Sequence, residues 1–422
     1  MVKSLLYTLP IFFLSIIFSA RGDLLSSDIM ATRDIVNNQT YVDGELDALA
    51  DDSFFGLDVI YGFWMYKITY ETIDANGLPT IASGVVAYPR VDWPDLTDEA
   101  FPILSYQHGT VIEKNAVTSE TGLWILPALI AGYGYVYVEP DYLGLGISEG
   151  LHPYQIKESY GSDVVDILRA TKQFSNESTE FQVNSQLFLA GYSEGGYATM
   201  AAHQIIERDH NNEFDITASF PMAGAYSMSG VMTDVMLDYT PYGQPYYFPY
   251  VLASYTDNYS TSLDSFSSYL LPEYESVLPE LFDGFHSASD INSIMPEIPI
   301  TIMKPDSILS FQNNPEHPLR IQLQNNDLFD WLPISAIYII HGIADELVPV
   351  ENAYIAYDYF IENGSQDVHI ELLPENLGGH ADAAPFALLG AFQLAESLNI
   401  INQIGDVNED GLIDVLDIIN QV

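Results

Sequence analysis

The sequence predicts an α/β protein with a mostly parallel central sheet that helices cover on both faces. The first of three observations supports this prediction, and the other two add a hairpin and an insertion. Short apolar runs of strand length alternate along the chain with longer runs whose apolar residues recur at helical spacing. Asn76-Gly77 separates two alternating runs and indicates a hairpin near the start of the domain. One stretch, at about 226–332, interrupts the rhythm and is far longer than an ordinary connection.

The expected elements follow one another in chain order. The hairpin comprises Tyr61–Ile73 and Ile81–Tyr88, where β-branched and aromatic residues are frequent. Further strands are expected at 102–107, Tyr135–Glu139, Gln186–Ala190, Ile216–Met222, Ala336–Ile340 and Val368–Leu373. Helices are expected at Leu123–Ala131, Tyr160–Phe174, Gly195–Arg208, Val350–Phe360 and Ala381–Leu398. The short apolar strands are typical of a parallel sheet that is buried on both faces.

Tyr, Phe, Pro and Met are concentrated in the interrupting stretch, most densely in YTPYGQPYYFPYVLASY. Disordered segments are poor in aromatic residues, so this stretch is expected to fold. We therefore predict a helical cap at about 226–332, inserted before the strand at Ala336–Ile340.

Charge and composition exclude several classes of function. The chain has 422 residues, 59 acidic against 12 basic side chains, a formal net charge of −47 and no cysteine. Such a charge repels phosphate groups, so nucleic acid is not an expected partner. The lack of cysteine excludes disulfides, cysteine-ligated zinc or iron–sulfur sites, and a lipid anchor attached to cysteine.

The first residues are typical of an export signal. Lys3 precedes an uncharged apolar run that ends at Arg21, with the small residues Ala20 and Gly22 near its end. We expect a signal peptide over residues 1–22 and a catalytic domain over residues 23–400. An uncleaved membrane anchor is the alternative, although Pro10 interrupts a run that is already short for a membrane span. A secreted chain without cysteine is more typical of bacteria than of eukaryotes.

The candidate nucleophile is Ser193, in the G-x-S-x-G pattern of Gly191-Tyr192-Ser193-Glu194-Gly195. The pattern alone is weak, but here it joins an expected strand to an expected helix. Glycines beside the serine permit the sharp turn that such a junction needs, and the helix N-terminus favours negative charge there. An ordinary serine in a glycine-rich turn is the alternative interpretation.

A serine hydroxyl needs a general base, and that base needs a partner to orient it. Where the chain order is serine, acid, histidine, the base lies in the last loop, which favours His380 over His203, His210 or His341. Asp345 follows the strand at Ala336–Ile340 and is the candidate acid, with Glu346 as the substitute. Helix capping is the competing role for both His380 and Asp345.

Acyl transfer also needs hydrogen-bond donors for the developing oxyanion. The residue after the nucleophile supplies one backbone N–H, which here belongs to Glu194. The second is expected from the loop after the strand at 102–107, where Thr110 follows Gly109. An ordinary strand-to-loop turn at this place is the alternative.

The sequence resembles the α/β-hydrolase superfamily and, within it, the secretory lipase family of bacteria and fungi. The matching strings span residues about 101 to 385 and are YQHGT, AGYGYVYVEPDYLGLG, HPY at 152–154, GYSEGGYATMAA, HGIADELVP and GGHADA. The resemblance implies a triad of Ser193, Asp345 and His380 and the hydrolysis of esters, often acylglycerols. Asp141 and Tyr142 lie in a matching string, and we expect them to be structural.

Residues 405–422 contain a calcium-loop pattern, DVNEDGLIDVLD, in which Gly411 stands at the sharp turn. The expected Ca²⁺ ligands are Asp406, Asn408, Asp410, the carbonyl of Leu412, and Asp417. An aspartate in the twelfth position resembles a dockerin repeat and would imply a cohesin partner. Dockerins pair two repeats, however, and the sequence contains one. An acidic tail is the alternative.

Together these features predict a secreted serine carboxylesterase or lipase that acts through an acyl-enzyme and needs no catalytic cofactor. Its expected substrate is an acylglycerol or a small acyl ester. Three alternatives stay open: a polysaccharide-directed esterase, a peptidase of the same fold, and a non-catalytic binding protein.

Overall fold

The computed structural model describes residues 20–48, 57–91, 100–122, 125–178 and 180–400. The expected calcium loop at 405–422 and residues 1–19 of the expected signal peptide lie outside the described residues. Arg21, at the end of that expected signal, is described, and its guanidinium lies 2.7 Å from the carboxylate of Asp166. None of the helices in the described ranges is long and apolar enough to cross a membrane.

The described strands form a nine-stranded sheet in the order β1-β2-β3-β5-β4-β6-β7-β8-β9. The strands are β1 (Leu24–Arg33), β2 (Gly62–Ile73), β3 (Pro79–Arg90), β4 (Ala100–Gln107), β5 (Val136–Pro140), β6 (Gln182–Tyr192), β7 (Ala218–Met222), β8 (Ala336–Gly342) and β9 (Val368–Leu373). The pairs β1–β2, β2–β3 and β3–β5 are antiparallel, whereas the pairs from β5 to β9 are parallel. The predicted mostly parallel sheet and its hairpin are therefore confirmed.

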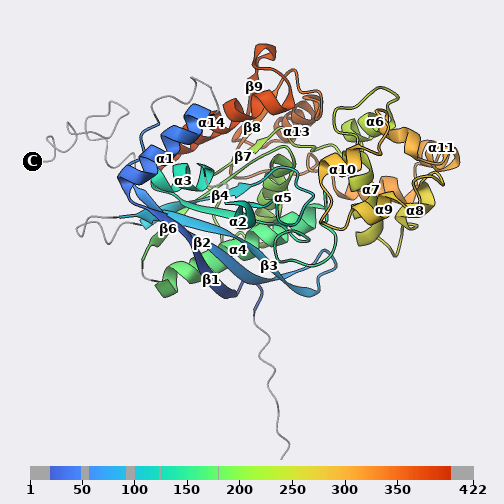
Figure 1. Cartoon of the computed structure of the whole chain (residues 1–422). Coiled ribbons are helices and arrows are strands. Elements are labelled where there is room, and N and C mark those ends of the chain that lie inside the picture. The colour runs from blue at the N-terminus through green and yellow to red at the C-terminus, as the bar shows by residue number, and fades with distance from the viewer. Residues whose placement is uncertain (1–19, 49–56, 92–99, 123–124, 179, 401–422) are drawn as a thin grey trace, which may run out of the picture.

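Helices cover both faces of the sheet (Figure 1). One face carries α1 (Ile35–Ala48), α3 (Ile125–Gly132) and α14 (His380–Leu398), and the other carries α4 (Lys157–Ser178), α5 (Glu194–Asp209) and α13 (Glu351–Glu362). Neighbouring strand residues point to opposite faces, so Leu187 and Phe188 of β6 belong to different apolar clusters. Both faces of the central strands are therefore buried, as the apolar runs predicted.

The stretch between β7 and β8 contains several short helices. They are α6 (Val231–Leu237), α7 (Tyr247–Asn258), α8 (Phe266–Tyr269), α9 (Leu278–Leu281), α10 (Ala288–Asn292), η3 (Pro299–Ile302), α11 (Pro305–Asn313) and α12 (Pro318–Asn325). In Figure 1 the labelled helices α6 to α11 gather beyond one end of the sheet. Buried aromatic residues such as Tyr250 and Tyr255 join this inserted segment to the core of the sheet.

Two elements at the start of the chain were not anticipated from the sequence. Among the described residues, strand β1 pairs along one side alone, with β2, and each of its residues is partly or fully exposed. An exposed edge strand needs no apolar run, because its partner supplies its backbone hydrogen bonds. Helix α1 likewise lacks a strong apolar stripe, and Val42 is its fully buried apolar residue.

Candidate active site

Ser193 lies at the junction of β6 and α5, where the chain turns sharply. Its backbone has φ 62° and ψ −121°, a conformation that side-chain-bearing residues rarely adopt. The Ser193 N–H donates to the Met222 carbonyl at 2.9 Å, which fixes the turn against β7. A strained residue of this kind, held by its surroundings at the end of a strand, is typical of functional sites.

The glycines around Ser193 are required by close backbone contacts. A Cβ at Gly195 would overlap the carbonyl oxygen of Gln107, and one at Gly196 would overlap that of Met222. A Cβ at Gly191 would in turn overlap the carbonyl oxygen of Gly195. The first turn of α5 therefore packs directly against the ends of β4 and β7 and leaves no room for larger residues.

The structure brings Ser193, His380 and Asp345 into one hydrogen-bonded chain. The Nε2 atom of His380 lies 2.8 Å from the Ser193 hydroxyl, and its Nδ1 atom lies 2.6 Å from Oδ2 of Asp345. His380 opens α14, and Asp345 lies in the loop after β8, so three separate elements supply the three groups. An imidazole placed in this way can take the hydroxyl proton while the carboxylate stabilises the resulting imidazolium.

Asp345 is held in its ionised form. Burial by itself would raise its pKa, but hydrogen bonds from histidine and backbone donors prevail and lower the pKa to about 2. The groups that lower the pKa are His341 and His380, together with the N–H groups of Leu347 and Val348, which lie 3.0 Å and 2.8 Å from Oδ1. His341 also lies near, with Nε2 at 3.5 Å from Oδ2, although that nitrogen hydrogen-bonds to the Val348 carbonyl at 2.8 Å.

Two further side chains fix the backbone of His380. The carboxylate of Glu346 accepts a hydrogen bond from the backbone N–H of His380 at 2.9 Å. Glu346 therefore contacts the His380 backbone, whereas Asp345 contacts the His380 ring. The hydroxyl of Tyr192 donates to the His380 carbonyl at 2.6 Å.

The other candidate bases hydrogen-bond elsewhere in the protein. His203 hydrogen-bonds to Ser219 and Glu207, and His210 hydrogen-bonds to Arg169. The structure does not bring either of them to Ser193.

Glu194 is the first residue of α5, where backbone N–H groups have no acceptor within the helix. Its side chain points into the protein and is fully buried. One carboxylate oxygen of Glu194 accepts from Tyr160 at 2.8 Å and lies 2.7 Å from Nε2 of His152. The backbone of Glu194 is therefore anchored by a buried polar network behind the turn.

Thr110 lies in the loop after β4, as expected, and borders the same site. Its hydroxyl is 3.1 Å from that of Tyr154, and no hydrogen bond to its N–H occurs among the described residues. The Tyr142 hydroxyl supports this loop by donating to the His108 carbonyl at 3.1 Å. Asp141 accepts hydrogen bonds from Ser83 and Ser119 at 2.5 Å and 2.7 Å. Asp141 and Tyr142 thus make structural contacts here.

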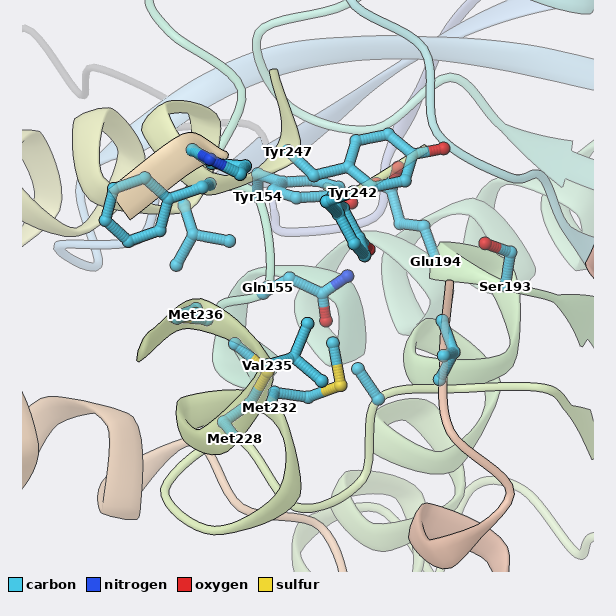
Figure 2. Close-up of a pocket in the computed structure, with 15 residues that line it drawn as sticks. Tyr154, Gln155, Ser193, Glu194, Met228, Met232, Val235, Met236, Tyr242 and Tyr247 are labelled. Carbon is cyan, nitrogen blue, oxygen red and sulfur yellow. The ribbon is translucent and has the colours of Figure 1, made fainter. Parts of the chain in front are cut away.

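A pocket of about 630 Å³, measured with its open mouth, adjoins Ser193. Its walls are mainly apolar and come largely from the inserted segment (Figure 2). The lining residues are Tyr154, Gln155, Ser193, Glu194, Ala225, Met228, Met232, Val235, Met236, Tyr242, Tyr247, Phe248, Val251, Pro299 and Val348. An apolar pocket with a few polar groups beside a reactive hydroxyl is suited to an apolar substrate group.

No role of His152 or Gln155 is predicted by the sequence, although His152 belongs to the string HPY and Gln155 adjoins it. The signal that could have identified His152 is its place in that string. Nothing in the sequence links it to Glu194, which is distant along the chain. Gln155 carries no sequence signal, because its position depends on an unusual backbone conformation with φ 59°.

Within the described ranges, no group of three or more acidic, histidine or cysteine side chains could hold a metal ion. The expected calcium ligands Asp406, Asn408, Asp410, Leu412 and Asp417 lie outside those ranges. Calcium binding there stays a prediction that a calcium titration of the full chain, followed by calorimetry, would test.

Comparison with known proteins agrees with this geometry. Residues 107–227 match a family model described as secretory lipase. No curated protein matches the chain. A Legionella pneumophila protein classed as a hydrolase is 28% identical to this chain, with a TM-score of 0.79. The match covers 89% of this chain and 98% of the Legionella chain. The rice cell wall degrading esterase LipA from Xanthomonas oryzae is 25% identical with a TM-score of 0.76, covering 88% and 95%.

Candida antarctica lipase A is similar in fold alone. It is 17% identical with a TM-score of 0.62, and the match covers 88% of this chain and 80% of the lipase. The chain thus has the α/β-hydrolase fold. The family model and the likeness to LipA show an enzyme of the carboxylic ester hydrolase class.

Proposed function

We propose that this protein is a secreted serine carboxylesterase or lipase that works through an acyl-enzyme intermediate. The observation that carries the proposal is the hydrogen-bonded chain from Ser193 through His380 to Asp345, at 2.8 Å and 2.6 Å. The apolar pocket beside Ser193 supports an ester with an apolar acyl chain as the substrate. The likeness to secretory lipases and the expected signal peptide support export of the protein.

The reaction would proceed in two halves. The Ser193 oxygen attacks the ester carbonyl carbon while Nε2 of His380 takes the hydroxyl proton. The N–H groups of Glu194 and Thr110 would stabilise the oxyanion. When the C–O bond to the alcohol breaks, His380 returns the proton to the departing oxygen. Water then attacks the acyl-enzyme, His380 takes one of its protons, and the carboxylic acid leaves as Ser193 regains its proton.

Hydrolysis of p-nitrophenyl esters with short to long acyl chains tests this proposal. We expect activity in the wild-type protein and a loss of about 10⁴-fold or more in kcat for Ser193→Ala and His380→Ala. The chain-length optimum would distinguish an esterase from a lipase. Equal activity in the wild-type protein and Ser193→Ala would overturn the proposal.

An esterase acting on plant polysaccharides is the second candidate. The observation that favours it is the likeness to LipA, which is described as a rice cell wall degrading esterase. Incubation of the protein with isolated plant cell walls, with Ser193→Ala as control, would release carboxylic acids if this candidate is right. Activity on soluble esters without such release would contradict it.

A further inference from the structure

We propose that Gln155 determines substrate specificity by binding a hydroxyl group on the acyl chain, so that hydroxyacyl esters are preferred over plain acyl esters. The inference rests on the proposed function, in which the pocket beside Ser193 holds the acyl chain. It adds the chemical class of that chain, which neither the fold nor the arrangement of Ser193, His380 and Asp345 specifies.

The carboxamide oxygen of Gln155 is buried without a partner. Gln155 is 4% exposed, lines the pocket, and has a carboxamide oxygen that accepts no hydrogen bond from any described residue. Figure 2 shows its carboxamide end within the pocket, near Met232 and Val235. Buried polar groups are nearly always hydrogen-bonded, so a carboxamide on the pocket wall whose oxygen has no partner points to a ligand.

Two tyrosine hydroxyls of the pocket wall already have partners. The Tyr154 hydroxyl is 3.1 Å from that of Thr110, and the Tyr242 hydroxyl donates to the Leu347 carbonyl at 2.9 Å. One oxygen of the Glu194 carboxylate accepts a hydrogen bond from Tyr160 at 2.8 Å, whereas its other oxygen also lacks a partner but belongs to an acidic group. The carboxamide of Gln155 is therefore the neutral polar group most available to a substrate.

The backbone around Gln155 is built to hold this side chain in place. Its φ of 59° is unusual for a residue with a side chain. The Gln155 N–H donates to the Tyr160 hydroxyl at 3.1 Å, and its carbonyl accepts from Tyr197 and Tyr255 at 3.2 Å and 3.0 Å. Three buried tyrosines thus maintain a strained conformation beside the site, which is where proteins tend to retain strain.

A hydroxyl is the group that suits a carboxamide in this setting. It can donate to the carboxamide oxygen and accept from the carboxamide nitrogen, so it fits either orientation of the amide. A plain alkyl chain would cover the carboxamide and leave it without any partner, which is unfavourable. Sites that hydrogen-bond a substrate hydroxyl discriminate strongly against analogues that lack it.

The test compares p-nitrophenyl octanoate with a series of esters that differ only in which chain carbon carries a hydroxyl. The wild-type protein should hydrolyse at least one hydroxylated ester with kcat/KM about tenfold above that of the plain ester. Gln155→Met should lower kcat/KM for that hydroxylated ester and raise it for the plain one. Gln155→Leu provides a second variant if Gln155→Met folds poorly, and Met236→Leu is the matched control on the apolar wall.

Opposite changes for the two esters in the Gln155 variants, with parallel changes in Met236→Leu, would support the proposal. A Gln155 variant that changes both esters by the same factor would overturn it. Wild-type activity on the plain ester with no preference at any hydroxyl position would also overturn it, while leaving the proposed function intact.

Binding of methyl ketones with the same chains to Ser193→Ala separates this proposal from catalysis, because ketones cannot be hydrolysed. Tighter binding of a hydroxylated ketone, lost on adding Gln155→Met, would support Gln155 as the determinant even if ester hydrolysis failed. Equal binding of all the ketones would overturn it.

Discussion

The imidazole of His152 lies 2.7 Å from the carboxylate of Glu194, directly behind the turn that carries Ser193. The other ring nitrogen of His152 is 2.8 Å from the Leu143 carbonyl and must carry a proton, since a carbonyl only accepts. A second proton must lie between Nε2 and the Glu194 carboxylate, because two lone pairs at this distance would repel. The pair therefore carries no net charge beneath the Glu194 N–H.

We expect His152→Phe to lower both the stability of the protein and its kcat, because the variant removes this shared proton. The variant keeps a ring but leaves the Glu194 carboxylate buried without its histidine partner, beside the proposed oxyanion site. Breaking a buried pair costs about 3–5 kcal/mol of stability, and a nearby negative charge should lower kcat by roughly 10²-fold. Thermal melting and ester kinetics measure the two effects.

The double variant with His152→Phe and Glu194→Gln separates charge from packing. Because glutamine carries no charge, the double variant should recover part of the kcat that His152→Phe loses. If the double variant is as slow as His152→Phe alone, packing of the imidazole is responsible and the charge argument is wrong.

Tyr192→Phe should weaken the positioning of His380. It removes the hydroxyl that donates to the His380 carbonyl at 2.6 Å. Loss of one neutral hydrogen bond is worth about 1 kcal/mol, so kcat should fall about fivefold. Tyr338→Phe is the matched control. Tyr338 lies near the start of β8, whereas Asp345 follows the end of that strand, and the Tyr338 ring stacks on His369. The Tyr338 hydroxyl has no hydrogen bond among the described residues. An equal loss in both variants would contradict the expectation.

Asp327→Asn should flatten the dependence of stability on pH. Burial raises the pKa of Asp327 to about 6, although hydrogen bonds from Ser229 oppose the shift. In the unfolded chain the carboxyl has a pKa of about 4. Between these values the folded state holds a proton that the unfolded chain has lost, so this carboxyl makes stability fall as pH rises.

Melting temperatures of the wild-type protein and Asp327→Asn across this range provide the measurement. The variant should gain stability relative to the wild type between about pH 4 and 6 and keep that gain at higher pH. Parallel curves for the two proteins would show that Asp327 does not titrate as described.

Gly195→Ala should disrupt the turn at Ser193. A Cβ there would overlap the Gln107 carbonyl oxygen, so we expect a loss of about 1–3 kcal/mol or more and little remaining activity. Gly390→Ala in α14 is the control, because a Cβ at Gly390 has nothing within 4 Å. Alanine is the better helix former, so this control should gain about 0.5–1 kcal/mol. Similar melting temperatures for the two variants would contradict the packing argument.

Local sequence patterns predicted much of the fold. The apolar runs at Gln186–Ala190 and Ala336–Ile340 gave strands because a strand buried on both faces must be apolar throughout. Asn76-Gly77 gave a hairpin because its conformational freedom suits a tight turn. Strand β1 was not predicted, because an edge strand is stabilised by hydrogen bonds to its neighbour and needs no distinctive apolar pattern in the sequence.

What the sequence determined by itself was the class of protein and the identity of the candidate catalytic groups. Ser193, Asp345 and His380 could be chosen because glycine spacing and chain order are properties of the sequence. The tertiary structure decided how these groups are supported. The contacts of Glu194 with His152, of Tyr192 with the His380 carbonyl, and of three tyrosines with Gln155 join residues far apart in the chain. Such pairings arise only when the packed sheet and helices bring separate segments together, and no local pattern encodes them.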